Sequence, residues 1–310
     1  RSCSDVDQVL VHIAVDDARL ATIKDLFGFF APDVEVVEFL AWDCLPFDRV
    51  SPSNEIVAKR VAALSRLIEW NDEKKRYPRV LLTTVNATLQ RVSPKEHFEK
   101  SGFTASKGGT IDQDQLFGFL TSNGYIRTET VREAGEFAVR GGIIDLFPSG
   151  YEKPVRLDLF GDEIDTIKVF DPLSQRTEDK LDSFSLRPVA EFFLDEDSIH
   201  RFRAGYREEF GAVRDGDPLY EAISEGRRYN GMDHWLPLFY GGEMDTIFDY
   251  ISAPVVSVDT QVDQARSDRN AQIEDFYQAR KTLQAAVKTR KPTKQNLKRG
   301  KGTDVSMTGA

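Results

Sequence analysis

Two arginines and a phenylalanine have the residue types and the spacing that suit binding chemistry. In Val155–Phe160, the period-two alternation of a β-strand places Arg156 and Phe160 on one face and the three aliphatic side chains on the other. In Glu136–Arg140, the same rule places Arg140 opposite the aromatic and aliphatic side chains. If the two strands are neighbours, the three side chains share one open sheet face. Arginine beside aromatic residues is typical of protein-interface hot spots, so this face is a candidate docking surface.

Two other interpretations of these residues remain open. Phe160 could pack beneath a helix while the arginines pair with nearby acids such as Asp158 or Asp162. Alternatively, the face could bind single-stranded nucleic acid, because bases stack on aromatic rings. That second alternative is disfavoured by the surrounding acids, which are Glu136, Asp158, Asp162, Glu163 and Asp165.

No motif in the sequence predicts a catalytic or metal site. Cys3 and Cys44 have no second cysteine or histidine at metal-ligand spacing, so no metal is expected. The four histidines are scattered and accompany no nucleophile motif, and His234 is interpreted as a packing or capping residue. The Gly-Gly pairs at 108 and 141 are interpreted as turn or strand glycines, because no G-x-x-x-x-G-K-[ST] phosphate loop occurs in the chain.

An α/β pattern occupies the first hundred residues. Apolar runs predict buried strands and capping signals predict helices between them, with strands at 9–15, 34–40 and 79–84 and helices at 16–29, 51–70 and 87–92. Ser51 followed by Pro52 is the predicted start of the second helix. Apolar strands alternating with helices predict a parallel sheet covered by helices. A further apolar strand at Ala253–Val258 predicts that the later part of the chain completes the same sheet.

The middle of the chain has a different pattern. A turn-rich stretch after Ser101 marks a boundary, and Asp112 is predicted to cap a helix that reaches about Thr121. Short strands are then predicted at 125–131, 136–140, 143–147, 155–160 and 163–171, which is typical of an antiparallel α+β unit. The predicted division is a first α/β half at 1–102, an inserted α+β domain at 103–188, a second α/β half at 189–280 and a basic flexible tail or linker at 281–310.

The composition predicts a globular protein with an acidic surface. Of 310 residues, 40% are hydrophobic, which is enough to build cores, and the net charge of −10 argues against general coating of nucleic acid. Residues 280–310 differ, because they carry nine lysines or arginines and one acid. No apolar run is long enough to span a membrane, and the first residues lack the apolar core of a signal peptide. Two cysteines fit a reducing compartment, so a cytoplasmic protein is expected.

Several long runs of the sequence are more specific than any short motif. The central runs are Gly135–Pro148, Arg156–Asp165 and Phe170–Thr177, and the flanking runs are Ala41–Pro52, Gly231–Tyr240 and Phe248–Pro254. Together they resemble, over roughly residues 8–280, a module shared by the excinuclease protein UvrB and the bacterial transcription-repair coupling factors. The resemblance implies a degenerate helicase-like (RecA-like) α/β domain in two halves with an inserted domain. It also implies that the inserted domain binds the excinuclease protein UvrA, with Arg140, Arg156 and Phe160 as the expected contacts.

One departure from the UvrB pattern concerns DNA. UvrB carries a tyrosine-rich hairpin that threads damaged DNA after its second strand, whereas the link from Phe39 to Ser53 is short and contains no tyrosine. Trp42, Pro46 and Phe47 are therefore expected to form a packed loop.

A second departure concerns ATP. Where UvrB has an Asp-Glu pair that holds magnesium and positions water, Asp259 is followed here by Thr260, which supplies no carboxylate. The phosphate loop itself would precede the first strand, so its absence is weaker evidence than this degenerate Walker B position. A site that does not hydrolyse ATP is the pattern of the coupling factors' amino-terminal module.

The resemblance to the coupling factors implies a role in DNA repair. It implies an amino-terminal module that recruits UvrA to RNA polymerase stalled at DNA lesions, with no cofactor in this part. A motor that uses ATP and magnesium, and contacts with RNA polymerase and double-stranded DNA, are expected in domains beyond residue 310. Two alternatives remain, a UvrB-like damage-recognition ATPase or helicase fragment and a nucleic-acid-binding module acting through the basic tail.

Overall fold

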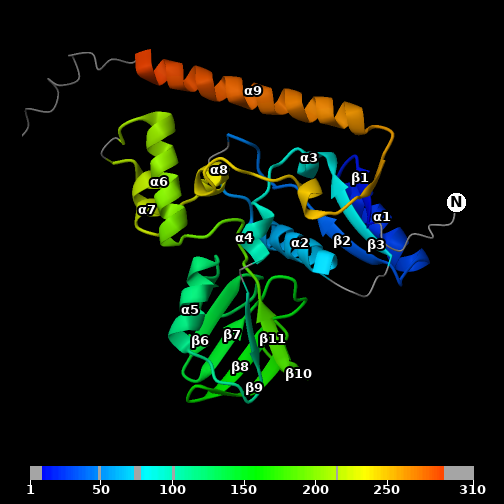
Figure 1. Ribbon diagram of the computed structural model, residues 1–310, viewed down its shortest axis with the longest axis vertical. Coiled ribbons are helices and arrows are strands. Elements are labelled where there is room, and N and C mark those ends of the chain that lie inside the picture. The colour runs from blue at the N-terminus through cyan, green and yellow to red at the C-terminus, as the bar shows by residue number, and fades with distance from the viewer. Residues whose placement is uncertain (1–8, 48–49, 73–77, 100–101, 214–215, 290–310) are drawn as a thin grey trace, which may run out of the picture.

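The computed structural model describes residues 9–47, 50–72, 78–99, 102–213 and 216–289. Within them the chain forms two bodies, an α/β body and a smaller body that we call the inserted body, residues 102–190 (Figure 1). The inserted body is the lower one in Figure 1, and chain from both sides of it in the sequence builds the upper one.

A four-stranded parallel sheet, with the order β12-β1-β3-β2, lies at the centre of the α/β body. β1 (Val9–Ala14) pairs with both β3 (Arg79–Thr84) and β12 (Val255–Val258), and β2 (Glu35–Phe39) pairs with β3. The predicted parallel sheet, and its completion by the later part of the chain, are therefore confirmed.

Helices cover both faces of this sheet. α1 (Asp17–Phe30) packs its buried Leu20 against one face, together with Val80 and Leu82 of β3. α2 (Asn54–Asp72) packs against the opposite face, where Val11 and Leu81 lie in the main core. Successive side chains of β3 thus pack alternately against α1 and α2, as expected for a parallel strand that is buried on both faces.

The starts of the two helices differ in how well the sequence predicts them. The first helix is predicted to be capped by Asp16 or Asp17, and the Asp16 carboxylate caps α1 by accepting the N–H of Arg19 at 2.7 Å. α2 begins three residues later than predicted, because Ser51 instead hydrogen-bonds Asp233. The hydroxyl of Ser53 takes the capping role.

Short helices complete the α/β body. Aromatic and aliphatic side chains from this group form a separate core around Phe202 and Phe239. The elements are α3 (Val85–Thr88), α4 (Lys95–Glu99), α6 (Glu196–Phe210), α7 (Pro218–Ser224), η1 (Met232–Trp235), α8 (Leu236–Phe239) and η2 (Ile247–Tyr250). The helix predicted at 87–92 is α3, which starts at Val85 because Thr84 caps it, and which ends at Thr88.

The inserted body is built on a six-stranded sheet with the order β10-β9-β8-β7-β6-β5. All its pairs are antiparallel except β5–β6, and α5 (Gln113–Ser122), capped by Asp112 as predicted, covers one face together with the β4–β11 pair. The strands are β4 (Phe103–Ser106), β5 (Ile126–Arg127), β6 (Glu136–Arg140), β7 (Ile143–Leu146), β8 (Val155–Phe160), β9 (Glu163–Phe170), β10 (Thr177–Leu181) and β11 (Ser183–Leu186).

The last helix, α9 (Val262–Thr289), lies across the top of the α/β body (Figure 1). It continues nine residues past Arg280, so the start of the predicted flexible tail is helical, and residues 290–310 lie outside the described residues. Its Tyr277 ring is 5.2 Å from the Phe47 ring, and Nε of Arg280 donates to the Phe47 carbonyl at 2.8 Å. The loop that contains Phe47 is packed, as predicted.

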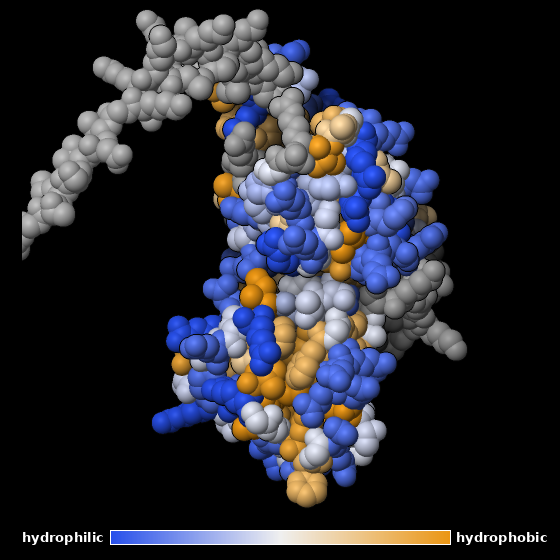
Figure 2. All heavy atoms as spheres, turned by 90° about the vertical axis from the view of Figure 1, so that its left-hand side faces the viewer, coloured by the Kyte–Doolittle hydropathy of each residue, from blue (hydrophilic) through white to orange (hydrophobic). Residues whose placement is uncertain are grey.

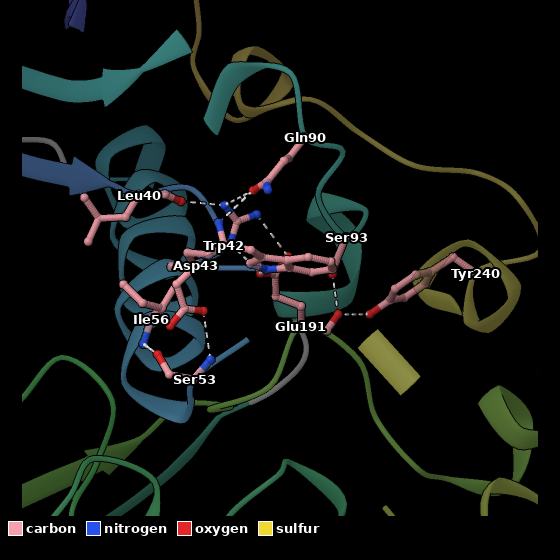
Figure 3. Close-up of polar contacts among 10 residues, drawn as sticks. Leu40, Trp42, Asp43, Ser53, Ile56, Gln90, Ser93, Glu191 and Tyr240 are labelled. Atoms are coloured by element: carbon pink, nitrogen blue, oxygen red, sulfur yellow. Dashed lines mark hydrogen bonds and ion pairs between the residues drawn. The ribbon is translucent and has the colours of Figure 1, made fainter. Parts of the chain in front are cut away.

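A buried ion pair joins the two halves of the α/β body. Arg60 on α2 and Glu191, just after the inserted body, are both buried, and Nε of Arg60 donates to Oε1 of Glu191 at 2.5 Å. The indole N–H of Trp42 donates to the same oxygen at 2.8 Å, and the guanidinium lies 4.4 Å above the Phe39 ring. Figure 3 shows Trp42 and Tyr240 converging on Glu191, whose backbone carbonyl accepts from the Tyr240 hydroxyl at 2.6 Å.

Candidate protein-docking surface

The open face of the six-stranded sheet carries the three predicted contact residues. Directly paired residues share a sheet face, and Arg140 pairs with Ile143 while Ile143 pairs with Asp158. Arg156 and Phe160 lie two residues before and two after Asp158 on β8, so alternation keeps them on the same face. The structure therefore brings all three together. That they contact a partner stays a prediction.

The opposite face of the sheet is buried and fixes this orientation. Leu159, between Asp158 and Phe160, packs against the core, so its two neighbours must point away from it. The core side chains are Phe137, Ile144, Leu146, Val155, Leu157, Ile164 and Ile167 of the sheet and Leu116 and Leu120 of α5. The arginine face is itself buried in part, where Ala138 and Phe170 pack with Val131 and Phe147, and it is exposed at Arg140 and Phe160.

Both arginines bind one buried carboxylate, that of Asp145 on β7. Oδ1 of Asp145 accepts from Nε of Arg156 at 2.6 Å, and Oδ2 accepts from Nη2 of Arg156 at 2.9 Å and from Nη2 of Arg140 at 2.5 Å. The Asp145 side chain is 0% exposed. Its hydrogen bonds with Arg156 raise the pKa of that guanidinium, and partial burial opposes the rise. Two parallel N–H···O bonds are the strong, planar form of this pairing.

The two arginines differ in how exposed they are and in how many of their N–H donors remain available to a partner. The Arg156 side chain is 17% exposed, its guanidinium lies 4.6 Å above the Phe170 ring, and Nη1 is 3.5 Å from the Gln175 carbonyl. The Arg140 side chain is 50% exposed, and Asp145 is the one hydrogen-bond partner it has among the described residues. Because a guanidinium has five N–H donors, Arg140 keeps most of its donors for a partner.

Phe160 is 84% exposed at the end of β8, before the turn that Gly161 makes with a φ of +63°. The alternative that Phe160 packs beneath a helix is therefore wrong. The expectation that the arginines pair with a nearby acid is correct, but the acid is Asp145. Asp158 instead accepts hydrogen bonds from Lys168 and Thr166, both at 2.6 Å. Burial alone would raise the pKa of Asp158, but these two bonds, together with the positive charges of Lys168 and Arg156, outweigh it and lower that pKa.

Asp145, the acid that both arginines contact, is not predicted from the sequence. It lies in the apolar run Ile143–Phe147, where an acid is a signal of a buried charge with a partner. The pairing of Asp145 with Arg156 across β7–β8 makes the contact. Alternation along each strand does not fix that register, because it is a property of the assembled sheet.

Hydrophobic side chains reach the surface of the inserted body. Figure 2 shows them gathered on the lower body among hydrophilic side chains. The large exposed hydrophobic residues of this segment are Ile126, Ile143, Phe160 and Leu173. Apolar surface rimmed by charged groups is typical of a protein-interaction site.

The Asp259 carboxylate lies beyond the end of β12, beside the start of α1. Its Oδ2 accepts the N–H of Val15 at 3.3 Å and is 3.4 Å from Nε of Arg19, and its Oδ1 is 3.6 Å from Nε2 of His12. Thr260 is exposed. Three groups of the protein thus surround the carboxylate that the sequence marks as a degenerate Walker B position.

The part of the chain that the structure describes was searched for clusters of metal ligands and for membrane-spanning helices. There, no group of three or more His, Cys, Asp or Glu side chains is arranged to hold a metal ion. In the same residues, none of the helices combines the length and the apolar character needed to cross a membrane.

Comparison with known proteins identifies what this chain resembles. Residues 103–192, which carry the arginine face, match the UvrB interaction domain family. Over 89% of its length the chain is 36% identical to a transcription-repair-coupling factor of Haemophilus influenzae, and over 81% it is 35% identical to one of Escherichia coli. A transcription-repair-coupling factor of Myxococcus xanthus is 33% identical over 83% of the chain. The chain is related to the transcription-repair-coupling factors.

These coupling factors are much longer than the chain. It spans 23% of the Haemophilus influenzae protein, 21% of the Escherichia coli protein and 22% of the Myxococcus xanthus protein. The resemblance to the coupling factors and to the UvrB module, drawn from the sequence runs, is confirmed for this part.

Proposed function

We propose that this chain is the amino-terminal module of a transcription-repair coupling factor and that it recruits the excinuclease protein UvrA to RNA polymerase stalled at DNA lesions. The observation that carries the proposal is the open face of the inserted body. On it Arg140, Arg156 and the exposed Phe160 lie together, inside the segment that matches the UvrB interaction domain family.

The chemistry of this face indicates what it would bind. Phe160 offers a large apolar side chain that is exposed in the free protein and would be desolvated on binding. Arg140 offers free guanidinium donors. A partner that presents a carboxylate or backbone carbonyls beside an apolar pocket fits both, and such aromatic and arginine anchors contribute most of the affinity in protein interfaces.

The other parts of the chain have separate roles in this proposal. The parallel-sheet body, in its two halves 1–102 and 189–280, is a degenerate helicase-like domain, and residues 103–188 are the inserted docking domain. ATP, magnesium, double-stranded DNA and RNA polymerase belong to other parts of a full-length coupling factor.

The first test measures binding of purified UvrA by titration. Arg156→Ala and Phe160→Ala are each expected to weaken binding by about 2 kcal/mol or more, the cost of removing a hot-spot side chain. Phe29→Ala is the matched control, since Phe29 on α1 is 79% exposed, close to the 84% of Phe160, but belongs to the other body. Wild-type affinity in both folded variants would refute the proposed surface.

ATP turnover distinguishes this proposal from an ATPase fragment. Asp259 already contacts Arg19, His12 and the backbone of Val15, and Thr260 adds no carboxylate, so the isolated chain is expected to hydrolyse no ATP above background. Turnover that disappears in Asp259→Asn would favour an enzyme instead. Salt-dependent DNA binding that is lost on deleting 281–310 would favour a nucleic-acid-binding module.

A further inference from the structure

We propose that Asp145 is a positioning residue for the docking surface, one that fixes the guanidinium groups of Arg140 and Arg156 before the partner arrives. The inference rests on the proposed function of the arginine face and adds a residue to it. Asp145 is 0% exposed, so it cannot touch a partner itself. Any effect it has on binding must act through the side chains that cover it.

The geometry assigns the two arginines different tasks. Arg156 gives two N–H groups to Asp145, at 2.6 and 2.9 Å, and its guanidinium lies 4.6 Å above the Phe170 ring. Arg140 gives one N–H group to Asp145 and remains half-exposed. Arg156 and Asp145 therefore form the fixed base of the site, and Arg140 is the arginine whose remaining donors can reach the partner.

The sheet register makes this arrangement possible. Asp145 is paired with Arg156 on β8 and with Ala138 on β6, so a small side chain lies beside the carboxylate on the β6 side. Arg140 follows Ala138 by two residues and shares its face, so its side chain can turn back to Asp145 along β6. A larger side chain at 138 would compete for that space.

Removing the carboxylate has two physical consequences for the arginines. The two positive charges would then repel each other across a short distance, and both long side chains would regain rotamer freedom. Binding would have to order them again, which lowers affinity without removing any group that touches the partner. A preorganised pair avoids that loss.

The test compares Asp145→Asn with Asp158→Asn in titrations with purified UvrA. Asp158 is the matched control, because it is a carboxylate on the same face that bonds Lys168 and Thr166 and gives neither arginine a hydrogen bond. Asp145→Asn is expected to weaken binding about tenfold or more, as loss of a buried charge partner does, and Asp158→Asn less than about threefold. Wild-type affinity in a folded Asp145→Asn variant overturns the inference.

Two further measurements separate positioning from a general loss of structure. In the wild type, the Nε–H signal of Arg156 in an NMR spectrum is expected to exchange slowly with water, and in Asp145→Asn to exchange fast while the core amides stay protected. In an Arg140→Ala/Arg156→Ala background, Asp145→Asn is expected to cause no further loss of affinity and to raise the melting temperature, because it removes an unpaired buried charge. A further loss of affinity in that background overturns the inference.

The same experiments keep this inference distinct from the proposed function. If the wild-type chain does not bind UvrA, or if Arg140→Ala/Arg156→Ala binds normally, the docking proposal fails and Asp145 has nothing to position. If Asp145→Asn does not fold, Arg156→Lys carries the test. Lysine keeps the charge but cannot bond both carboxylate oxygens in one plane, so a loss of about tenfold is expected and wild-type affinity overturns the inference.

Discussion

At the scale of single residues, His97 on α4 shows how packing changes acid–base behaviour. Its ring stacks on Phe193 with centroids 4.4 Å apart and meets the Tyr240 ring edge-on at 4.8 Å. Burial among these rings lowers the pKa of His97. The nearby Asp195 opposes the shift and Arg201 adds to it. The neutral imidazole is therefore the form that the fold favours.

This lowered pKa predicts a loss of stability in mild acid. As the pH falls below about 6.5, the unfolded chain protonates His97 before the folded protein does, so the free energy of unfolding decreases. The decrease ends once the pH passes the lower pKa of the folded state. His97→Gln is expected to flatten the melting temperature between about pH 6.5 and pH 5.

His200→Gln is the control for that measurement, because His200 is exposed on α6. Burial raises the pKa of Asp233, so protonation of Asp233 increases the stability of the folded state as the pH falls. The slope of melting temperature against pH in each variant is therefore compared with the wild-type slope. An unchanged slope in His97→Gln would contradict the assignment.

Also at the scale of residues, the sequence predicts which face of the sheet a side chain lies on better than it predicts which residue that side chain contacts. Alternation along β6 and β8 correctly puts Arg140, Arg156 and Phe160 on one face, because burial of the other face enforces the period of two. It does not reveal Asp145 as the acid between the arginines. That contact depends on which residue of β7 lies opposite Arg156, and the register is set by the assembled sheet.

At the scale of elements, most strands with a buried face are predicted, whereas β4, β10 and β11 are missed, although β11 buries Phe184 and Leu186. β1, β3 and β8 carry apolar side chains into a core, and the sequence pattern finds them. β10 has mostly exposed, charged side chains, so no alternation marks it. β4 lies in a turn-rich stretch and is held by pairing with the distant β11, which local sequence does not encode.

α9 is the element whose tertiary anchoring can be tested most directly. Tyr277→Ala removes the ring that packs 5.2 Å from Phe47 and is expected to cost about 1 kcal/mol or less, because both rings are partly exposed. The larger effect is expected in hydrogen exchange, as faster exchange in the second half of α9 with an unchanged sheet.

Phe276→Ala provides the comparison for α9. Phe276 is the adjacent residue, is exposed to a similar degree and makes no aromatic contact among the described residues. Equal exchange rates in the Tyr277 and Phe276 variants would show that the Phe47 contact does not anchor the helix.

At the scale of the whole molecule, the Arg60–Glu191 pair fastens the segment before the inserted body to the segment after it. Glu191→Gln leaves a buried guanidinium without its counter-charge and is expected to lower the free energy of unfolding by about 3–5 kcal/mol. Urea denaturation measures this change.

The control for Glu191→Gln is Glu55→Gln, which breaks the exposed pair between Glu55 and Lys59 on the same helix as Arg60. It is expected to change stability by about 0.3–0.5 kcal/mol. A loss in Glu191→Gln no larger than that of the control would mean that the pair does not fasten the two segments.

The pairing of β12 with β1 also orders events during synthesis. β1 opens the described chain and its edge partner β12 ends at Val258, whereas every strand of the inserted body has been made by Leu186. At about 5–20 residues per second, the ribosome gives the inserted body seconds in which to fold while β1 still lacks that partner. A nascent chain would therefore present a finished six-stranded sheet beside an α/β sheet that is still waiting for its last strand.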